Sequence, residues 1–109
     1  ACPVKAERVL LEEVLKGREV SAFALCDGED FVPIGYACDY KRVNDGNIGP
    51  NTGGMGGFSP VGWPSERIRS FVNEKIFSSV LSGMKKRGIP FRGILFAGLM
   101  IDEDDVRVI

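Results

Sequence analysis

The sequence contains no histidine, and its three cysteines, Cys2, Cys26 and Cys38, form no Cys-x-x-Cys pair. Zinc sites are built mainly from these two residue types at short, regular spacings, so the sequence argues against a zinc-binding domain. An odd number of cysteines also fits reduced thiols better than a disulfide framework. We therefore expect a cytoplasmic protein.

Charge of one sign and long apolar runs are lacking as well. Lysine and arginine number 14 against 15 aspartates and glutamates, which gives a formal net charge of -1. Nucleic-acid-binding domains usually carry a basic excess, and a membrane-spanning helix needs ~20 consecutive apolar residues. We expect neither a nucleic-acid partner nor a membrane partner. At 109 residues, residues 1–109 form one domain or a piece of one.

Three segments in the first half of the chain have strand character. The apolar run RVLLEEVL predicts a buried strand over 8–15, interrupted by its two glutamates, and EVSAFALCDG predicts a second strand over 19–28. The turn sequence at 27–30 reverses the chain into a third strand, FVPIGYACDYKR, over 31–42. Pro33 places this strand at a sheet edge or a bulge. Together the three predict an antiparallel meander.

The second half predicts one long helix followed by a hairpin. Pro64 and Ser65 start the helix, Gly88 and Pro90 end it, and apolar residues recur at helical spacing on one face: Ile68, Phe71, Val72, Ile76, Val80 and Met84. A buried strand over 93–101, an acidic turn over 102–105 and a returning strand from 106 follow. The fold class is therefore α+β, of the α/β type: a mainly antiparallel sheet with one long packed helix.

Glycine is concentrated between the third strand and the helix. Half of the 14 glycines lie in this segment: Gly46, Gly49, Gly53, Gly54, Gly56, Gly57 and Gly62. Neither GxxxxGK[ST] nor GxGxxG occurs, so the two commonest phosphate-binding loops are absent. Glycines allow a backbone to approach a ligand closely and to present its N–H groups to an anion. A long surface loop with tight turns is the alternative.

Charged residues flank this segment. Asp39, Lys41 and Arg42 end the third predicted strand, and the two cations are suited to hold a phosphate or a carboxylate. The alternative is a solvated strand end with a surface ion pair. Glu12, Glu13 and Glu19 form another group, which can converge from neighbouring strands to accept hydrogen bonds from ribose hydroxyls, or can simply face solvent.

Three stretches carry a family resemblance. In this order, LLEEVLKGREVSAFALCDG, DYKRVNDGNIGPNTGGMGGFSP and GILFAGLMID resemble the glycinamide ribonucleotide synthetases, also called phosphoribosylamine-glycine ligases. GPNTGGMG, over 49–56, is the most specific of these motifs. The resemblance spans nearly the whole chain and implies part of an ATP-grasp fold. It also implies an ATP-dependent carbon-nitrogen ligase of purine biosynthesis, with ATP and Mg2+ as cofactors and glycine and 5-phosphoribosylamine as substrates.

The resemblance also implies roles for individual residues. The backbone of Glu12, Glu13, Val14 and Leu15 would form the hinge strand that holds adenine, and Glu19 would bind the ribose hydroxyls. Lys41 and Arg42 would lie close to the phosphates as catalytic cations. The remaining implied residues would contact the amino acid and the phosphoribosylamine: Asn51, Thr52, Gly53, Gly54, Met55 and Gly56.

The sequence departs from the family pattern in two respects. Tyr40 stands where many members have histidine, which puts a proton-transfer role at that position in doubt. The acidic, asparagine-bearing strand that supplies the metal ligands in the family would follow residue 109, so no metal ligand is assigned within the chain. We therefore expect an internal fragment, dependent on the rest of a parent chain and inactive by itself. A non-catalytic nucleotide-binding or folding module is the alternative function.

Overall fold

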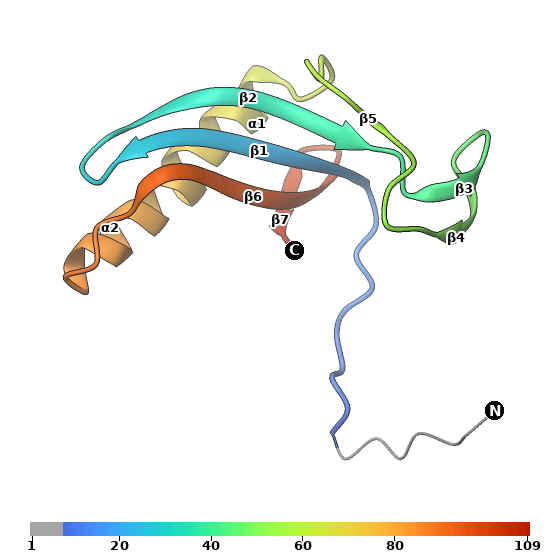
Figure 1. Ribbon diagram of the computed structural model, residues 1–109, viewed down its shortest axis with the longest axis horizontal. Coiled ribbons are helices and arrows are strands. Elements are labelled where there is room, and N and C mark those ends of the chain that lie inside the picture. The colour runs from blue at the N-terminus through green and yellow to red at the C-terminus, as the bar shows by residue number, and fades with distance from the viewer. Residues whose placement is uncertain (1–7) are drawn as a thin grey trace.

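The computed structural model describes residues 8–109, which form a five-stranded sheet, a two-stranded hairpin and one long helix (Figure 1). The five strands follow the order β5-β2-β1-β6-β7, and every pairing is antiparallel. Their bounds are β1 (Arg18–Asp27), β2 (Phe31–Asp39), β5 (Gly57–Phe58), β6 (Arg92–Asp102) and β7 (Asp105–Val108). The hairpin consists of β3 (Arg42–Asn44) and β4 (Ile48–Asn51). The predicted α+β class with a mainly antiparallel sheet is confirmed.

Strand β1 lies at the centre of the sheet, between β2 and β6. The turn into β2 is held by the Asp27 carboxylate, whose Oδ1 accepts hydrogen bonds of 2.8 Å from the N–H groups of Glu29 and Asp30. These bonds lower the pKa of Asp27. Pro33 lies opposite Ala24, next to a bulge in the β1–β2 register, as its missing N–H predicted.

The predicted strand over 8–15 is wrong. This segment has no regular structure and leads away from the sheet (Figure 1), and its apolar side chains are exposed, 81% for Val9 and 94% for Leu11. A strand requires a hydrogen-bonding neighbour. Both edges of β1 are already occupied by β2 and β6, so the predicted meander is replaced by a sheet that β6 completes.

The long helix is confirmed, but it contains a π-helical turn. It runs through α1 (Glu66–Phe71), a π segment (Val72–Phe77) and α2 (Ser78–Lys86), and the Ser65 hydroxyl caps it by accepting the N–H of Ile68. A π turn adds one residue and rotates the following side chains around the axis.

This rotation corrects the predicted apolar face. The buried helix residues are Ile68, Val72, Phe77 and Leu81, so the interval between the second and third is five residues. The helix therefore buries Phe77 and Leu81 most deeply, whereas the predicted Ile76 is half-buried against the core and the predicted Phe71 and Val80 are exposed. Spacing of 3.6 residues could not predict this shift, because the extra residue changes the phase only after Val72.

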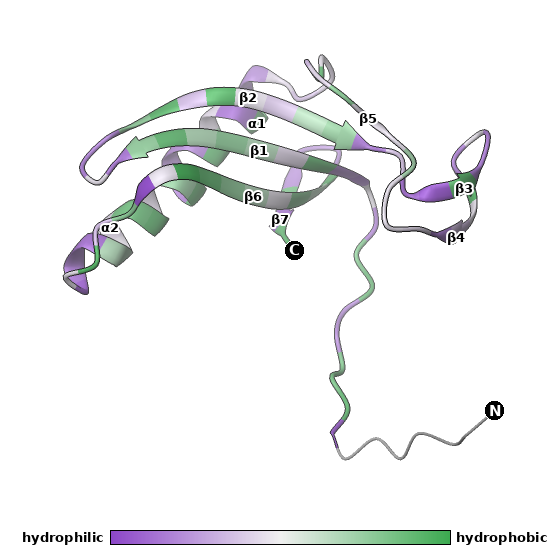
Figure 2. Cartoon of the chain, viewed as in Figure 1, coloured by the Kyte–Doolittle hydropathy of each residue, from purple (hydrophilic) through white to green (hydrophobic). Residues whose placement is uncertain are grey.

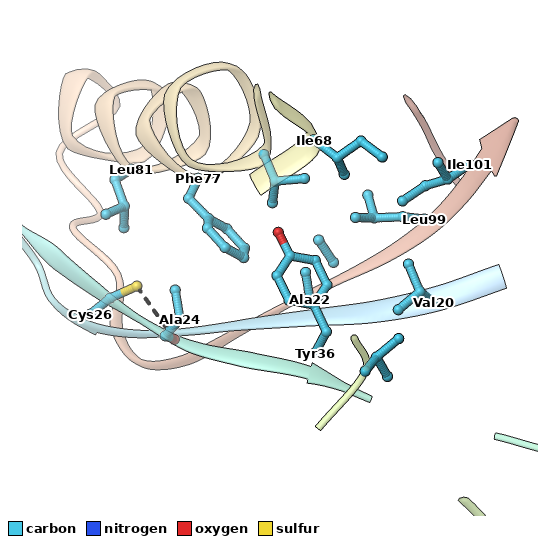
Figure 3. Close-up of a cluster of buried hydrophobic side chains, with 13 residues drawn as sticks. Val20, Ala22, Ala24, Cys26, Tyr36, Ile68, Phe77, Leu81, Leu99 and Ile101 are labelled. Carbon is cyan, nitrogen blue, oxygen red and sulfur yellow. Dashed lines mark hydrogen bonds between the residues drawn. The ribbon is translucent and has the colours of Figure 1, made fainter. Parts of the chain in front are cut away.

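The core lies between the helix and one face of the sheet. Figure 3 shows Phe77 and Leu81 pointing from the helix toward Ala22, Ala24 and Leu99 of the sheet. Alternating residues of β1 are buried, as period-two patterning requires. Much of β1 and β6 is coloured hydrophobic in Figure 2. The rings of Phe23 on β1 and Phe96 on β6 lie with their centroids 5.6 Å apart.

The acidic turn between β6 and β7 is a hairpin reversal, as predicted. Two of its four acidic residues are paired with cations: Asp104 accepts from Arg67 and Asp105 from Arg107, each at 2.9 Å. Both pairs are exposed. No helix among residues 8–109 has the length and apolar character needed to cross a bilayer.

Candidate functional site

The glycine-rich segment is more ordered than a surface loop. The predicted third strand ends at Asp39, and after Tyr40 and Lys41 the chain forms the β3–β4 hairpin, which lies beyond the end of β2 in Figure 1. The chain then returns as β5 and pairs with Cys38 and Asp39. The segment therefore projects from one end of the sheet and rejoins it.

A hollow of about 490 Å3 opens beside this segment, next to the start of β1 and the ends of β2 and β6. Four of the residues predicted for the site line it together: Glu19, Lys41, Arg42 and Asn51. They come from β1, from the β2–β3 junction and from the hairpin. The structure thus brings the predicted ribose-binding acid and the two predicted cations to one surface.

The Lys41 ammonium lies between two carboxylates. Its Nζ is 2.9 Å from Asp39 Oδ2 and 3.9 Å from Glu19 Oε1. The hydrogen bond and charge of Asp39, and then the charge of Glu19, raise the pKa of Lys41 above its ordinary value. Lys41 is therefore a cation at neutral pH and is suited to bind an anion rather than to accept a proton.

Arg42 and Tyr40 line a second hollow as well as this one. The Arg42 guanidinium donates to the Gly49 carbonyl at 2.8 Å across the hairpin. It also lines a hollow of about 610 Å3, which Tyr40 and Met55 border. Met55, a predicted substrate-binding residue, thus lies beside the first hollow rather than in it.

Met100 is a residue of the site that sequence reasoning missed. It is the cross-strand neighbour of Glu19 in the β1–β6 register and lines the same hollow. Period-two alternation gives the signal that could have found it, because Leu99 and Ile101 face the core and Met100 must face the other side.

The predicted hinge residues border a third hollow, of about 280 Å3. Glu13, Val14 and Leu15 line it together with Met100, whereas Glu12 does not. The predicted convergence of Glu12, Glu13 and Glu19 is therefore not observed. Glu13 and Glu19 lie in separate hollows that share Met100, because the segment before Gly17 is not a strand of the sheet.

The glycine loop, residues 51–56, uses some of its backbone N–H groups in internal hydrogen bonds and not others. The Thr52 N–H donates to the Lys41 carbonyl at 2.6 Å, that of Gly54 to the Thr52 hydroxyl at 3.1 Å, and that of Met55 to the Tyr40 carbonyl at 2.7 Å. The N–H groups of Gly53 and Gly56 make none of these loop bonds. Gly53 and Gly56 therefore keep backbone donors outside these bonds, although Thr52, Gly53, Gly54 and Gly56 do not line the hollow.

Potential metal ligands do not gather in the part of the chain that the structure describes. Within residues 8–109 no group of three or more Cys, Asp or Glu side chains is arranged to hold a metal ion. In the acidic turn, Asp104 and Asp105 are each paired with an arginine.

Burial makes the two described cysteines poor nucleophiles. Cys26 is buried and Cys38 half-buried, both are free, and burial raises the pKa of each thiol. A raised pKa leaves less thiolate at neutral pH, and the thiolate is the reactive form. Cys2 lies outside the described residues.

We expect iodoacetamide at pH 7.5 to alkylate Cys26 and Cys38 more slowly in the folded chain than in urea, with rates that increase above pH 9. Peptide mass spectrometry over pH 6–10 measures each cysteine separately. A half-maximal rate at Cys38 below about pH 8, lower than the ordinary thiol pKa, would contradict this expectation.

Comparisons with known proteins agree in one family. Residues 4–109 match the model of the phosphoribosylglycinamide synthetase ATP-grasp (A) domain. The chain is 49% identical over 96 residues to a chloroplastic phosphoribosylamine-glycine ligase of Arabidopsis thaliana, covering 88% of this chain and 18% of the relative. It is 47% identical to the Streptomyces coelicolor ligase, covering 94% of this chain and 25% of the relative.

A solved structure gives the same result. The crystal structure of a phosphoribosylamine-glycine ligase from Thermotoga maritima superimposes with a TM-score of 0.74 at 43% identity, covering 89% of this chain and 24% of that chain. The chain thus spans about a quarter of the length of that ligase.

Proposed function

Because the chain belongs to the phosphoribosylglycinamide synthetase ATP-grasp family, we propose that it forms part of an ATP-dependent carbon-nitrogen ligase. This ligase joins glycine to 5-phosphoribosylamine through a glycyl phosphate, in purine biosynthesis. The observation that carries the proposal is the assembly of Glu19, Lys41, Arg42 and Asn51 around one hollow beside the glycine loop. The free thiols of Cys26 and Cys38 fit a reducing compartment such as the cytoplasm.

The hollow has the chemistry that a nucleotide requires. Glu19 supplies a carboxylate that can accept two hydroxyl donors, Lys41 supplies a cation, and Met100 supplies an apolar surface beside them. We assign ribose to Glu19 and the base to the surface formed by Met100 with the backbone of residues 13–15. This assignment places the phosphates toward Lys41 and Arg42.

The chain's own residues would act on charge and position. When the glycine carboxylate attacks the terminal phosphate, negative charge is spread over the phosphoryl oxygens, and fixed cations and N–H donors stabilise it without reorganisation. Lys41 is held in place for this role by Asp39. The N–H groups of Gly53 and Gly56 would orient the reacting carboxylate.

Magnesium would neutralise phosphate charge in such a reaction. Residues 8–109 do not fit a magnesium site, because no group of three or more acidic or cysteine side chains converges in them. We therefore assign no metal ligand to this chain and attribute no step of the reaction to one of its carboxylates acting through a metal.

We expect Glu19→Gln, in a ligase of full family length that carries this segment, to weaken ATP binding about tenfold to a hundredfold. Hydrogen bonds to a charged acceptor contribute about 1.5–3 kcal/mol, and glutamine replaces that acceptor by a neutral one. The KM for glycine should change much less. Calorimetric titration of ATP, together with initial rates at varied ATP and varied glycine, measures both effects.

Glu66→Gln is the matched control, because Glu66 lies in the first turn of α1 and does not line the hollow. An unchanged ATP affinity in Glu19→Gln, with an unchanged preference over 2′,3′-dideoxy-ATP, would contradict the ribose assignment. The activity itself is tested by incubating the full-length protein with labelled ATP, Mg2+, glycine and fresh phosphoribosylamine. ATP binding without formation of glycinamide ribonucleotide would favour a non-catalytic binding module instead.

A further inference from the structure

Thr52 is the half-buried member of a loop whose other residues are exposed. Along 51–56, the neighbouring asparagine, the glycines and the methionine all face solvent. Its own hydroxyl donates to the Lys41 carbonyl at 2.9 Å, and its N–H donates to the same oxygen at 2.6 Å. Thr52 is therefore fixed against the β2–β3 junction by two bonds.

The Thr52 hydroxyl also holds the next turn of the loop. Its oxygen accepts the Gly54 N–H at 3.1 Å, in addition to donating to Lys41. A hydroxyl has a single hydrogen, so its donor capacity is used entirely within the protein. This is the pattern of a side chain that orders a turn rather than one that waits for a ligand.

The residue that Thr52 holds, Lys41, also lines the hollow. The carbonyl of Lys41 receives both bonds from Thr52, while its ammonium lies 2.9 Å from Asp39 and 3.9 Å from Glu19. A single residue thus joins the glycine loop to the carboxylate assigned to the nucleotide.

We propose that Thr52 is a positioning residue that fixes the glycine loop against the backbone of Lys41. It thereby sets the distance between the amino-acid substrate and the nucleotide. The proposal rests on the proposed ligase function. It also revises the expectation that Thr52 contacts substrate directly: the loop contacts come from its neighbours Gly53 and Gly56, and Thr52 acts through Lys41 and Gly54.

The test compares Thr52→Val with Thr52→Ser in a ligase of full family length that carries this segment. Valine keeps the shape and the N–H bond to Lys41 but removes the hydroxyl, whereas serine keeps the hydroxyl. We expect Thr52→Val to lower kcat/KM for glycine about tenfold, the effect of one or two neutral hydrogen bonds. The KM for ATP should stay within about twofold, and Thr52→Ser should recover most of the activity.

Amide hydrogen exchange supplies a readout that does not depend on turnover. Thr52→Val should accelerate exchange of the Gly54 N–H about tenfold, and Thr52→Ser should leave it protected. Equal losses in both variants, no loss in either, or unchanged exchange at Gly54 in Thr52→Val would overturn the positioning role. An unmodified protein that exchanges as expected but forms no glycinamide ribonucleotide would contradict the ligase function instead, and the exchange data would still decide whether Thr52 orders the loop.

Discussion

Replacing Gly17 by alanine is expected to destabilise the folded chain by about 3–5 kcal/mol, because two costs combine at this residue. Gly17 has a φ of +125°, which L side chains rarely adopt. A Cβ atom built there would lie 2.3 Å from the Ile101 carbonyl oxygen and 2.6 Å from its carbon. Both neighbours are backbone atoms of β6, so the clash can be relieved only by a shift of the backbone at Gly17 or in β6.

Alanine substitutions at two other glycines distinguish the cost of backbone strain from the cost of the steric clash. Gly35 has a φ of +145° but no atom within 4 Å of a built Cβ, so Gly35→Ala should show the backbone strain alone, about 1–2 kcal/mol. Gly83 lies in α2 with open space around it, so Gly83→Ala should stabilise by up to about 1 kcal/mol. Urea unfolding followed by circular dichroism measures all three variants. A Gly17→Ala cost no larger than that of Gly35→Ala would show that the close approach to Ile101 is unimportant.

The sequence predicted those elements whose evidence is local. Strands β1, β6 and β7, the capped helix and the acidic turn follow from alternation, capping and turn chemistry in their own residues. The segment 8–15 has the apolar, β-branched composition of a strand, yet composition does not supply the neighbouring strand that it would need. The π turn could not be predicted from the sequence either. It turns Phe77 toward the sheet, and the spacing of apolar residues in the helix contains no information about the sheet surface.

The candidate site was predictable in its residue types and not in its geometry. Strand ends indicated Glu19, Lys41 and Arg42, and the ion pair of Asp39 with Lys41 was the alternative stated for that strand end. Only the folded chain shows that Lys41 and Met100 both lie beside Glu19. Pairing between strands determines these two neighbours, which are far from Glu19 in sequence. The hydrogen bonds of Thr52 were hidden for the same reason.

Gly53→Ala is expected to lower kcat/KM for glycine by two to three orders of magnitude in a ligase of full family length, with a Tm within about 2 °C of the unmodified protein. A built Cβ at Gly53 meets no atom within 4 Å, and its φ is not in the left-handed region. The methyl group therefore has room in the free protein and costs little in folding. In a loop that closes on a ligand it would occupy the ligand's position, and a displacement of about 1 Å from a reactive geometry costs roughly a hundredfold in rate.

Gly54→Ala provides the contrast within the same loop. Gly54 has a φ of +122° and donates its N–H to Thr52, so alanine there should lower both the Tm and the activity. Gly83→Ala, far from the loop in sequence and located in α2, should leave activity unchanged. Initial rates at varied glycine, together with thermal unfolding, distinguish the three variants. Full activity in Gly53→Ala would assign the glycine segment to a surface turn, because only a backbone that a substrate approaches closely requires the missing methyl group at a position with open space and an ordinary φ.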